Sequence, residues 1–213
     1  MSIHVSLTNE EQLQNFKKWW CKHYAVITIC FAVVVLSLSG YKYFMWRQQQ
    51  LLFNASNFYE RLMVAFSNNN DREIKSYSNR IIHNYNKTIY ADVSRMTLAK
   101  IAMMHKKYDE AYQLLNYIVK NSKLPSFRQI ARIRIARILL ITKKFADASN
   151  ELKIIEDASY IGIVEELQGD IYVQLGEYKK AKLLYNKAIQ STQKHGLGNL
   201  FLEMKINELG ILG

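Results

Sequence analysis

The chain has 213 residues, 49% of them hydrophobic and 12% aromatic, which is enough to bury the core of one ordinary domain. One proline, Pro125, and eight glycines supply too few turn residues for an all-β fold, so long helices joined by short turns are expected. The net charge of +11 is scattered and accompanies no zinc-finger, RNA-recognition or helix-turn-helix signature, so we predict no nucleic-acid partner; a basic surface equally suits a neighbour of anionic lipid or acidic proteins.

The first predicted element is a hydrophobic segment between Lys22 and Lys42, in which no Asp, Glu, Lys or Arg occurs. As a helix it would be about 28 Å long, close to the thickness of a bilayer's hydrocarbon core. Aromatic residues, which favour the membrane–water interface, flank it on both sides: Phe16, Trp19, Trp20 and Tyr24, then Tyr41, Tyr43, Phe44 and Trp46. We predict a tail over 1–22, a transmembrane helix over 23–43 that anchors the protein in the lipid bilayer, and a repeat domain over 44–213.

Two alternatives bear on this segment: a buried core helix, which is disfavoured because no polar stripe interrupts the run, and a cleaved signal peptide. Ser37 and Ser39 resemble the small residues of a signal-peptide cleavage site, but the long preceding stretch and the continuing aromatics favour a retained anchor. The basic residues before the segment exceed those just after it by one, which weakly favours a cytoplasmic N-terminus. Cys21 and Cys30 lie on this helix nine residues apart, too far to form a disulfide.

Behind the anchor, the sequence repeats. When Tyr108, Phe145 and Tyr178 are aligned, the alanines three residues later coincide: Ala111, Ala148 and Ala181. The intervals of 37 and 33 residues bracket the period of about 34 residues that is typical of tetratricopeptide (TPR) helix pairs. We predict clear units at about 91–122, 126–157 and 162–192, a degenerate unit at about 57–84, and a cap over 197–212.

The last unit resembles the TPR pattern most closely. Its small, aromatic and turn residues occupy the family's positions: Gly169, Tyr172, Gly176, Tyr178, Ala181, Tyr185 and Ala188. Core packing explains the aromatics and the alanines among them, because an aromatic fills the space between two helices and a small residue allows their close crossing. The predicted fold class is all-α: a single N-terminal transmembrane helix followed by a TPR-like α-solenoid with a C-terminal capping helix.

A bound partner would meet the concave face of the first helices. The most concentrated charge there is a set of four arginines: Arg128, Arg132, Arg134 and Arg137. The first two share a face by i,i+4 spacing and the last two by i,i+3 spacing. Two interpretations stay open: a solvated helix face, or a contact with an acidic peptide or a lipid headgroup.

No residue pattern points to chemistry. The histidines are dispersed without metal-ligand spacing, and the adjacent Glu165 and Glu166 lie on different helix faces, so they cannot form an acid/base pair. No glycine-rich phosphate loop, nucleophile elbow or zincin motif occurs. We predict a protein that is not an enzyme and has no catalytic residue, metal or cofactor.

Three segments resemble the YfgM-type ancillary subunit of the bacterial SecYEG translocon: GIVEELQGDIYVQLGEYKKAKLLYNKAI from Gly162, LEMKINEL from Leu202, and NKTIYADVSRMTLAK from Asn86. The likeness covers nearly the whole chain, which departs from the family in its stronger basic character and its worn first unit. The resemblance implies a single-pass protein of the bacterial inner membrane, with its N-terminus in the cytoplasm and its repeats in the periplasm. The implied partners are Sec translocon subunits and periplasmic chaperones or secreted clients.

Two functions follow from different classes. The first is a translocon-associated adaptor that helps to pass secreted proteins to periplasmic chaperones. The second is a TPR scaffold that assembles another envelope complex without binding clients. A regulator whose repeats face the cytosol is a third possibility, since charge alone orients the anchor weakly.

Overall fold

The computed structural model describes residues 9–193 and 200–212, and the chain forms two compact units, Met1–Phe53 and Asn54–Gly213. Residues 1–8 of the predicted tail and 197–199 of the predicted cap lie outside the described residues. The described elements are all helical: α1 (Asn9–Ser67), α2 (Asp71–Asn84), α3 (Ile89–Met104), α4 (Tyr108–Asn121), α5 (Pro125–Ile141), α6 (Phe145–Lys153), the 3-10 turn η1 (Ala158–Tyr160), α7 (Ile161–Gln174), α8 (Tyr178–Gln193) and α9 (Leu200–Leu212). This confirms the predicted all-α class.

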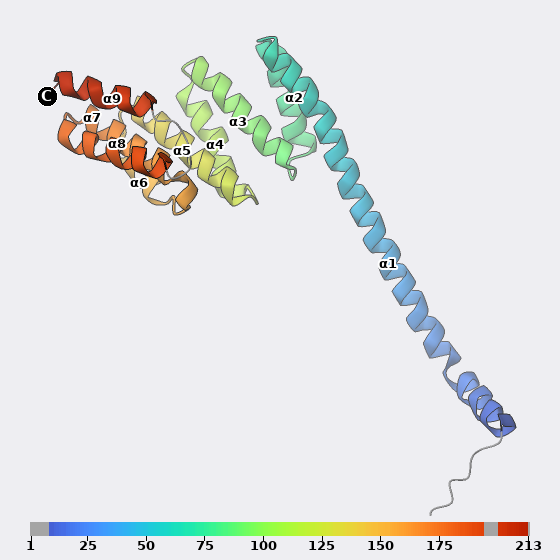
Figure 1. Cartoon of the computed structure of the whole chain (residues 1–213). Coiled ribbons are helices and arrows are strands. Elements are labelled where there is room, and N and C mark those ends of the chain that lie inside the picture. The colour runs from blue at the N-terminus through green and yellow to red at the C-terminus, as the bar shows by residue number, and fades with distance from the viewer. Residues whose placement is uncertain (1–8, 194–199, 213) are drawn as a thin grey trace, which may run out of the picture. The chain divides into compact units, whose positions relative to one another are not determined.

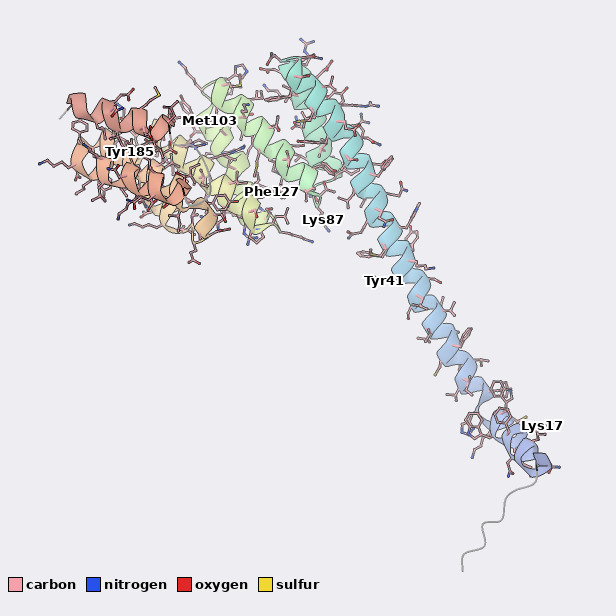
Figure 2. All side chains as sticks on the ribbon, viewed as in Figure 1. Lys17, Tyr41, Lys87, Met103, Phe127 and Tyr185 are labelled. Atoms are coloured by element: carbon pink, nitrogen blue, oxygen red, sulfur yellow. The ribbon has the colours of Figure 1, made fainter. Side chains whose placement is uncertain are left out.

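The N-terminal unit consists of the first part of α1. Among the described residues, this is the one helix long and apolar enough to cross a membrane. Its side chains project outward around the helix (Figure 2). Apolar side chains are among them: Phe31 is 70% exposed and Leu36 is 72% exposed. The hydroxyls of Thr28 and Ser37 donate to backbone oxygens four residues earlier at 2.8 Å, so these polar groups are satisfied within the helix. The segment is therefore a candidate membrane span.

The second unit is a series of helix pairs, and the same kind of turn joins the two helices within each pair. Each turn has a residue with positive φ two positions before the next helix: Asn69 (51°), Lys106 (60°), Lys143 (60°) and Gly176 (76°). The residue after it donates its N–H to a carbonyl five positions back, as Lys107 does to Ala102 at 2.8 Å and Glu177 to Tyr172 at 2.9 Å. This is the Schellman turn, which satisfies the last carbonyls of the first helix.

The turn at Asn69 shows that the stretch at about 57–84 forms a fourth helix pair, although the sequence pattern there is degenerate. The end of α1 pairs with α2 around a buried cluster that includes Leu62, Ala65, Ile74 and Ile81. Asparagine tolerates the left-handed conformation that this turn requires, so the backbone repeats even where the TPR side-chain pattern does not.

Two further clusters fill the rest of the second unit. The larger one runs through α3 to α7, and the smaller one joins α7, α8 and α9 (Figure 1). In α9, Leu202 and Leu209 are each 6% exposed and pack with Ala181 and Tyr185 of α8. The LEMKINEL segment thus supplies the apolar face that closes the end of the series.

Candidate binding surface

Two of the four predicted arginines, Arg128 and Arg132, are used within the fold. Arg128 donates from Nη1 to the backbone oxygen of Ser122 at 2.8 Å and so closes the loop that precedes α5. Arg132 forms an ion pair with Glu151 of α6, with 2.7 Å between Nη1 and Oε2. Both arginines are partly buried, and their partners fix the α5 N-terminus and the α5–α6 pairing.

Arg134 and Arg137 differ from the other two, because neither forms an ion pair with a carboxylate in the part of the chain that the structure describes. Arg137 is exposed and Arg134 is half-buried on the same helix. Burial first, and the charge of Arg137 second, lower the pKa of Arg134 from its ordinary value. Two neighbouring guanidinium groups without a counter-charge make this end of the arginine set the part suited to an anionic partner.

The predicted TPR residues lie at the contacts between helices. The alanines of the second helices are fully buried at 0% exposure: Ala111, Ala148, Ala181 and Ala188. The aromatics that begin these helices are half-buried against the clusters: Tyr108, Phe145 and Tyr178, with Tyr172 beside the last of them. Gly176 is exposed and forms the turn, whereas Gly169 is buried against Tyr185.

A polar network at Tyr185 went unnoticed in the sequence. Tyr185, labelled in Figure 2, donates its hydroxyl to Asp170 at 2.7 Å. Lys205 of α9 lies between two carboxylates, 2.7 Å from Asp170 and 2.8 Å from Glu166. The network therefore ties the cap to α7 and α8. Its bonded pairs are 15 to 39 residues apart in the sequence, and the repeat period carries no signal for a partner outside the repeats.

A second network that the sequence analysis missed surrounds Arg95 of α3. This arginine is only 4% exposed, and its guanidinium lies 3.9 Å from the ring centroid of Tyr117 in α4. Its Nη1 is 3.3 Å from Oδ1 of Asp92, one turn earlier. The i,i+3 spacing of Asp92 and Arg95 is visible in the sequence, but burial of the pair is not. The buried charge is compensated inside the fold, so this site is structural.

The described residues contain no group of three or more His, Cys, Asp or Glu side chains placed to hold a metal ion. Glu165 and Glu166 face different partners: Glu165 accepts from Ser191 at 2.8 Å, and Glu166 binds Lys205. Cys21 and Cys30 are free and exposed. These arrangements hold helices together and form no constellation of nucleophile, base and oxyanion donor.

Fold and surface define a helical repeat protein that carries a candidate membrane anchor. The family described as "Tetratricopeptide repeat-like domain" matches residues 17–211. A protein of Buchnera aphidicola subsp. Schizaphis graminum named "Ancillary SecYEG translocon subunit" is 31% identical over 151 residues, 71% of this chain and 76% of its own length. Proteins with the same name from Aggregatibacter actinomycetemcomitans and Haemophilus influenzae are each 24% identical over 204 residues, 96% of this chain and 98% of their own.

No solved structure matches the chain. The family match nevertheless spans both the candidate anchor and the repeats, and the relatives align with nearly the whole length. The chain belongs to the family of ancillary SecYEG translocon subunits, which carry a tetratricopeptide repeat-like domain.

Proposed function

We propose that this protein is a membrane-tethered adaptor of the Sec translocon, with its N-terminus in the cytoplasm and its repeats in the periplasm. The observation that carries the proposal is the alignment of 96% of the chain, candidate span included, with proteins named ancillary SecYEG translocon subunits. An anchor confines the repeats to the membrane surface near the site where secreted segments emerge. That confinement raises the effective concentration of the repeats for weakly bound clients.

The face of α5 that carries Arg134 and Arg137 is the proposed contact for acidic segments of clients or of periplasmic chaperones. Support comes from these two guanidinium groups, which form no ion pair with a carboxylate among the described residues, since charged hydrogen bonds from arginine to carboxylates are among the stronger polar contacts. Arg128 and Arg132 are left out of this contact, because Ser122 and Glu151 already occupy them. Passing a client to a chaperone then requires only binding and release.

Co-purification from mild detergent tests the translocon association. Translocon subunits should accompany the tagged full chain and should be lost when the segment 23–43 is replaced by an unrelated transmembrane helix of equal length. Recovery of a different envelope complex, without translocon subunits, would favour the scaffold function and contradict the adaptor.

A phosphatase fused to the C-terminus tests the orientation of the chain. The fusion should be active, because that enzyme folds only after translocation, and an inactive fusion would contradict the periplasmic placement.

Client binding has a separate test. A photo-crosslinker at position 137 should capture secreted chains during export, because this residue is exposed and carries no ion pair to a described carboxylate. The same crosslinker at position 120, an exposed lysine of α4, is the control. Crosslinks from position 137 to fixed partners alone, with no nascent chain among them, would mean that the protein is a scaffold and not a client-binding adaptor.

A further inference from the structure

A groove lies between α6 and α8, the second helices of the last two pairs, and α7 forms its floor. Its volume is about 760 Å³, and large apolar side chains line it, among them Ile171, Leu175 and Leu183. Leu175 is 50% exposed and Leu183 is 54% exposed. The groove is separate from the arginines of α5, since none of them lines it. Exposed leucines in a concavity are uncommon on a surface without a partner.

The rim of this groove is basic. Lys153, Lys179 and Lys180 line it, and no aspartate or glutamate does. Lys180 is already paired with Glu177 and lies 5.3 Å from the Tyr172 ring centroid. Lys153 and Lys179, by contrast, form no ion pair with any carboxylate that the structure describes. Two ammonium groups therefore flank the apolar floor without a counter-charge.

The basic character continues along the outer face of α8. A shallower depression beside the groove is lined by Lys179, Lys182, Leu183 and Lys187. Leu183 thus belongs to both depressions, and lysines line each of them. Lys182 and Lys187 are exposed. The charged residues that line these two depressions are all lysines, and this excess of positive charge attracts acidic partners and repels basic ones.

The preceding repeat contains the equivalent groove, and the charged residues that line that groove are mostly acidic instead of basic. That groove lies between α4, α5 and α6, has a volume of about 440 Å³, and is lined by Asp109, Asp147 and Glu151 with a single lysine, Lys144. In the repeat alignment that equates Phe145 with Tyr178, Asp147 corresponds to Lys180, Asn150 to Leu183 and Glu151 to Leu184. Thr142 likewise corresponds to Leu175.

The two grooves show which lining residues the repeat fold requires and which it does not. Both grooves arise from the same succession of helices and the same Schellman turn, at Lys143 and at Gly176. Since one copy is stable with aspartate, asparagine and threonine at the lining positions, the repeat does not require leucine and lysine there. The exposed leucines and lysines of the last groove therefore need another explanation, and binding supplies it.

We propose that the α6–α8 groove binds an acidic segment of a partner protein, which inserts one or two large apolar side chains between its carboxylates. The apolar floor takes the inserted side chains, and Lys153 and Lys179 at the rim face the carboxylates. The proposal goes beyond the translocon association and does not depend on it. An anionic membrane is the less suitable ligand, because a flat headgroup layer leaves the floor of a groove empty.

The test uses the full chain in uncharged detergent and a short fluorescent peptide. The peptide carries Leu and Phe one helical turn apart, flanked by Asp and Glu, and its twin carries Lys at every acidic position. Fluorescence anisotropy should show binding of the acidic peptide only, and binding should weaken as salt rises. Lys179→Glu should weaken it about fivefold, and Leu183→Asn, which installs the residue of the preceding groove, about tenfold.

Lys120→Glu is the matched control, because it makes the same charge change at an exposed residue of α4 that does not line the groove. It should leave the affinity for the acidic peptide within about twofold of that of the unmodified protein. Equal binding of both peptides, or equal effects of Lys179→Glu and Lys120→Glu, would overturn the proposal. Displacement of the peptide by phosphatidylglycerol in mixed micelles, with the same dependence on Lys179, would assign the groove to lipid and overturn it as well. All three substituted positions are exposed, and circular dichroism verifies the fold of each variant. Failed co-purification with the translocon leaves these outcomes unaffected.

Discussion

At the scale of single residues, Gly169 determines how closely α7 and α8 can approach. A Cβ atom at this position would lie 2.4 Å from Cε1 of the Tyr185 ring. The ring cannot retreat freely, because its hydroxyl is held by Asp170 at 2.7 Å. A glycine inside a helix costs about 1 kcal/mol relative to alanine, so its presence here reflects the close contact.

We therefore predict that Gly169→Ala lowers the free energy of unfolding by about 2–3 kcal/mol, the usual cost of overpacking. Thermal or denaturant unfolding of the full chain, followed by circular dichroism, measures this. Gly210→Ala is the control, because a Cβ atom there meets nothing within 4 Å. It should be neutral or slightly stabilising. An unchanged midpoint for Gly169→Ala would mean that the two helices can separate without cost.

Tyr185 itself should make stability depend on alkaline pH. Burial first, and the hydrogen bond to Asp170 second, raise the pKa of Tyr185 well above its ordinary value. In the unfolded chain a tyrosine ionises near pH 10, whereas the folded protein keeps the proton. The folded state's advantage is therefore complete below about pH 10 and declines as the pH rises beyond it.

The corresponding prediction concerns Tyr185→Phe. At neutral pH this change should cost about 1.5–2 kcal/mol, because it removes a hydrogen bond to a charged group. The difference from the unmodified protein should narrow between pH 10 and about 11.5, since only the unmodified protein loses the Tyr185 contribution there. Denaturant titrations at several pH values measure the difference. A constant difference across this range would contradict the proton-linked role.

At the scale of elements, the recurring turn decides where each helix pair bends. Lys143 adopts φ of 60° at the position where Gly176 adopts 76°. A side chain in this left-handed region costs about 1 kcal/mol, and glycine avoids the cost.

Lys143→Gly should accordingly stabilise the repeats by about 0.5–1 kcal/mol, whereas Gly176→Ala should destabilise them by about 1 kcal/mol. The neighbouring Lys144 has φ of −89°, so Lys144→Gly makes the same chemical change without relieving strain. It should destabilise slightly, and unfolding midpoints compare the three variants. Equal shifts for Lys143→Gly and Lys144→Gly would show that backbone strain is not the cause.

The sequence pattern predicts the last three helix pairs and misses much of the first for a physical reason. Where the later pairs have an aromatic and an alanine, the first has Asp71 and Ile74. Asp71 instead binds His105 at the next turn, with 2.5 Å between Oδ2 and Nε2, and Ile74 is buried at 1% exposure. Different side chains thus fill the same backbone arrangement, and only the turn geometry reveals the repeat.

The arginine surface shows the same limit. Helical spacing groups Arg128 with Arg132 and Arg134 with Arg137, because the period of a helix is local information. That the first two are occupied by Ser122 and Glu151 depends on how α5 packs on the loop before it and on α6. Such contacts join residues that no short-range spacing relates.

At the scale of the whole molecule, the first part of α1 is a candidate membrane anchor for the chain. Its apolar side chains are exposed along α1, which is unfavourable in water and favourable in lipid. Composition alone predicts this span, since it needs only length and hydropathy. The charges that flank it nearly balance and so orient it only weakly, and the periplasmic placement is therefore part of the proposal that rests on the family resemblance.

Val33→Arg tests the anchor directly, because residue 33 is at the middle of the predicted span. An arginine at the centre of a membrane helix costs about 2.5–3.5 kcal/mol of insertion free energy. We predict that a substantial part of the protein then becomes extractable from membranes by alkaline carbonate, whereas Leu52→Arg, beyond the span, leaves it integrated. Because the repeats fold around their own clusters, both variants should keep the same repeat-domain melting transition. If the exported protein lacks its first forty residues, the segment is a cleaved signal peptide and not an anchor. The repeats would then not be held at the membrane, and the proposed rise in their effective concentration would not occur.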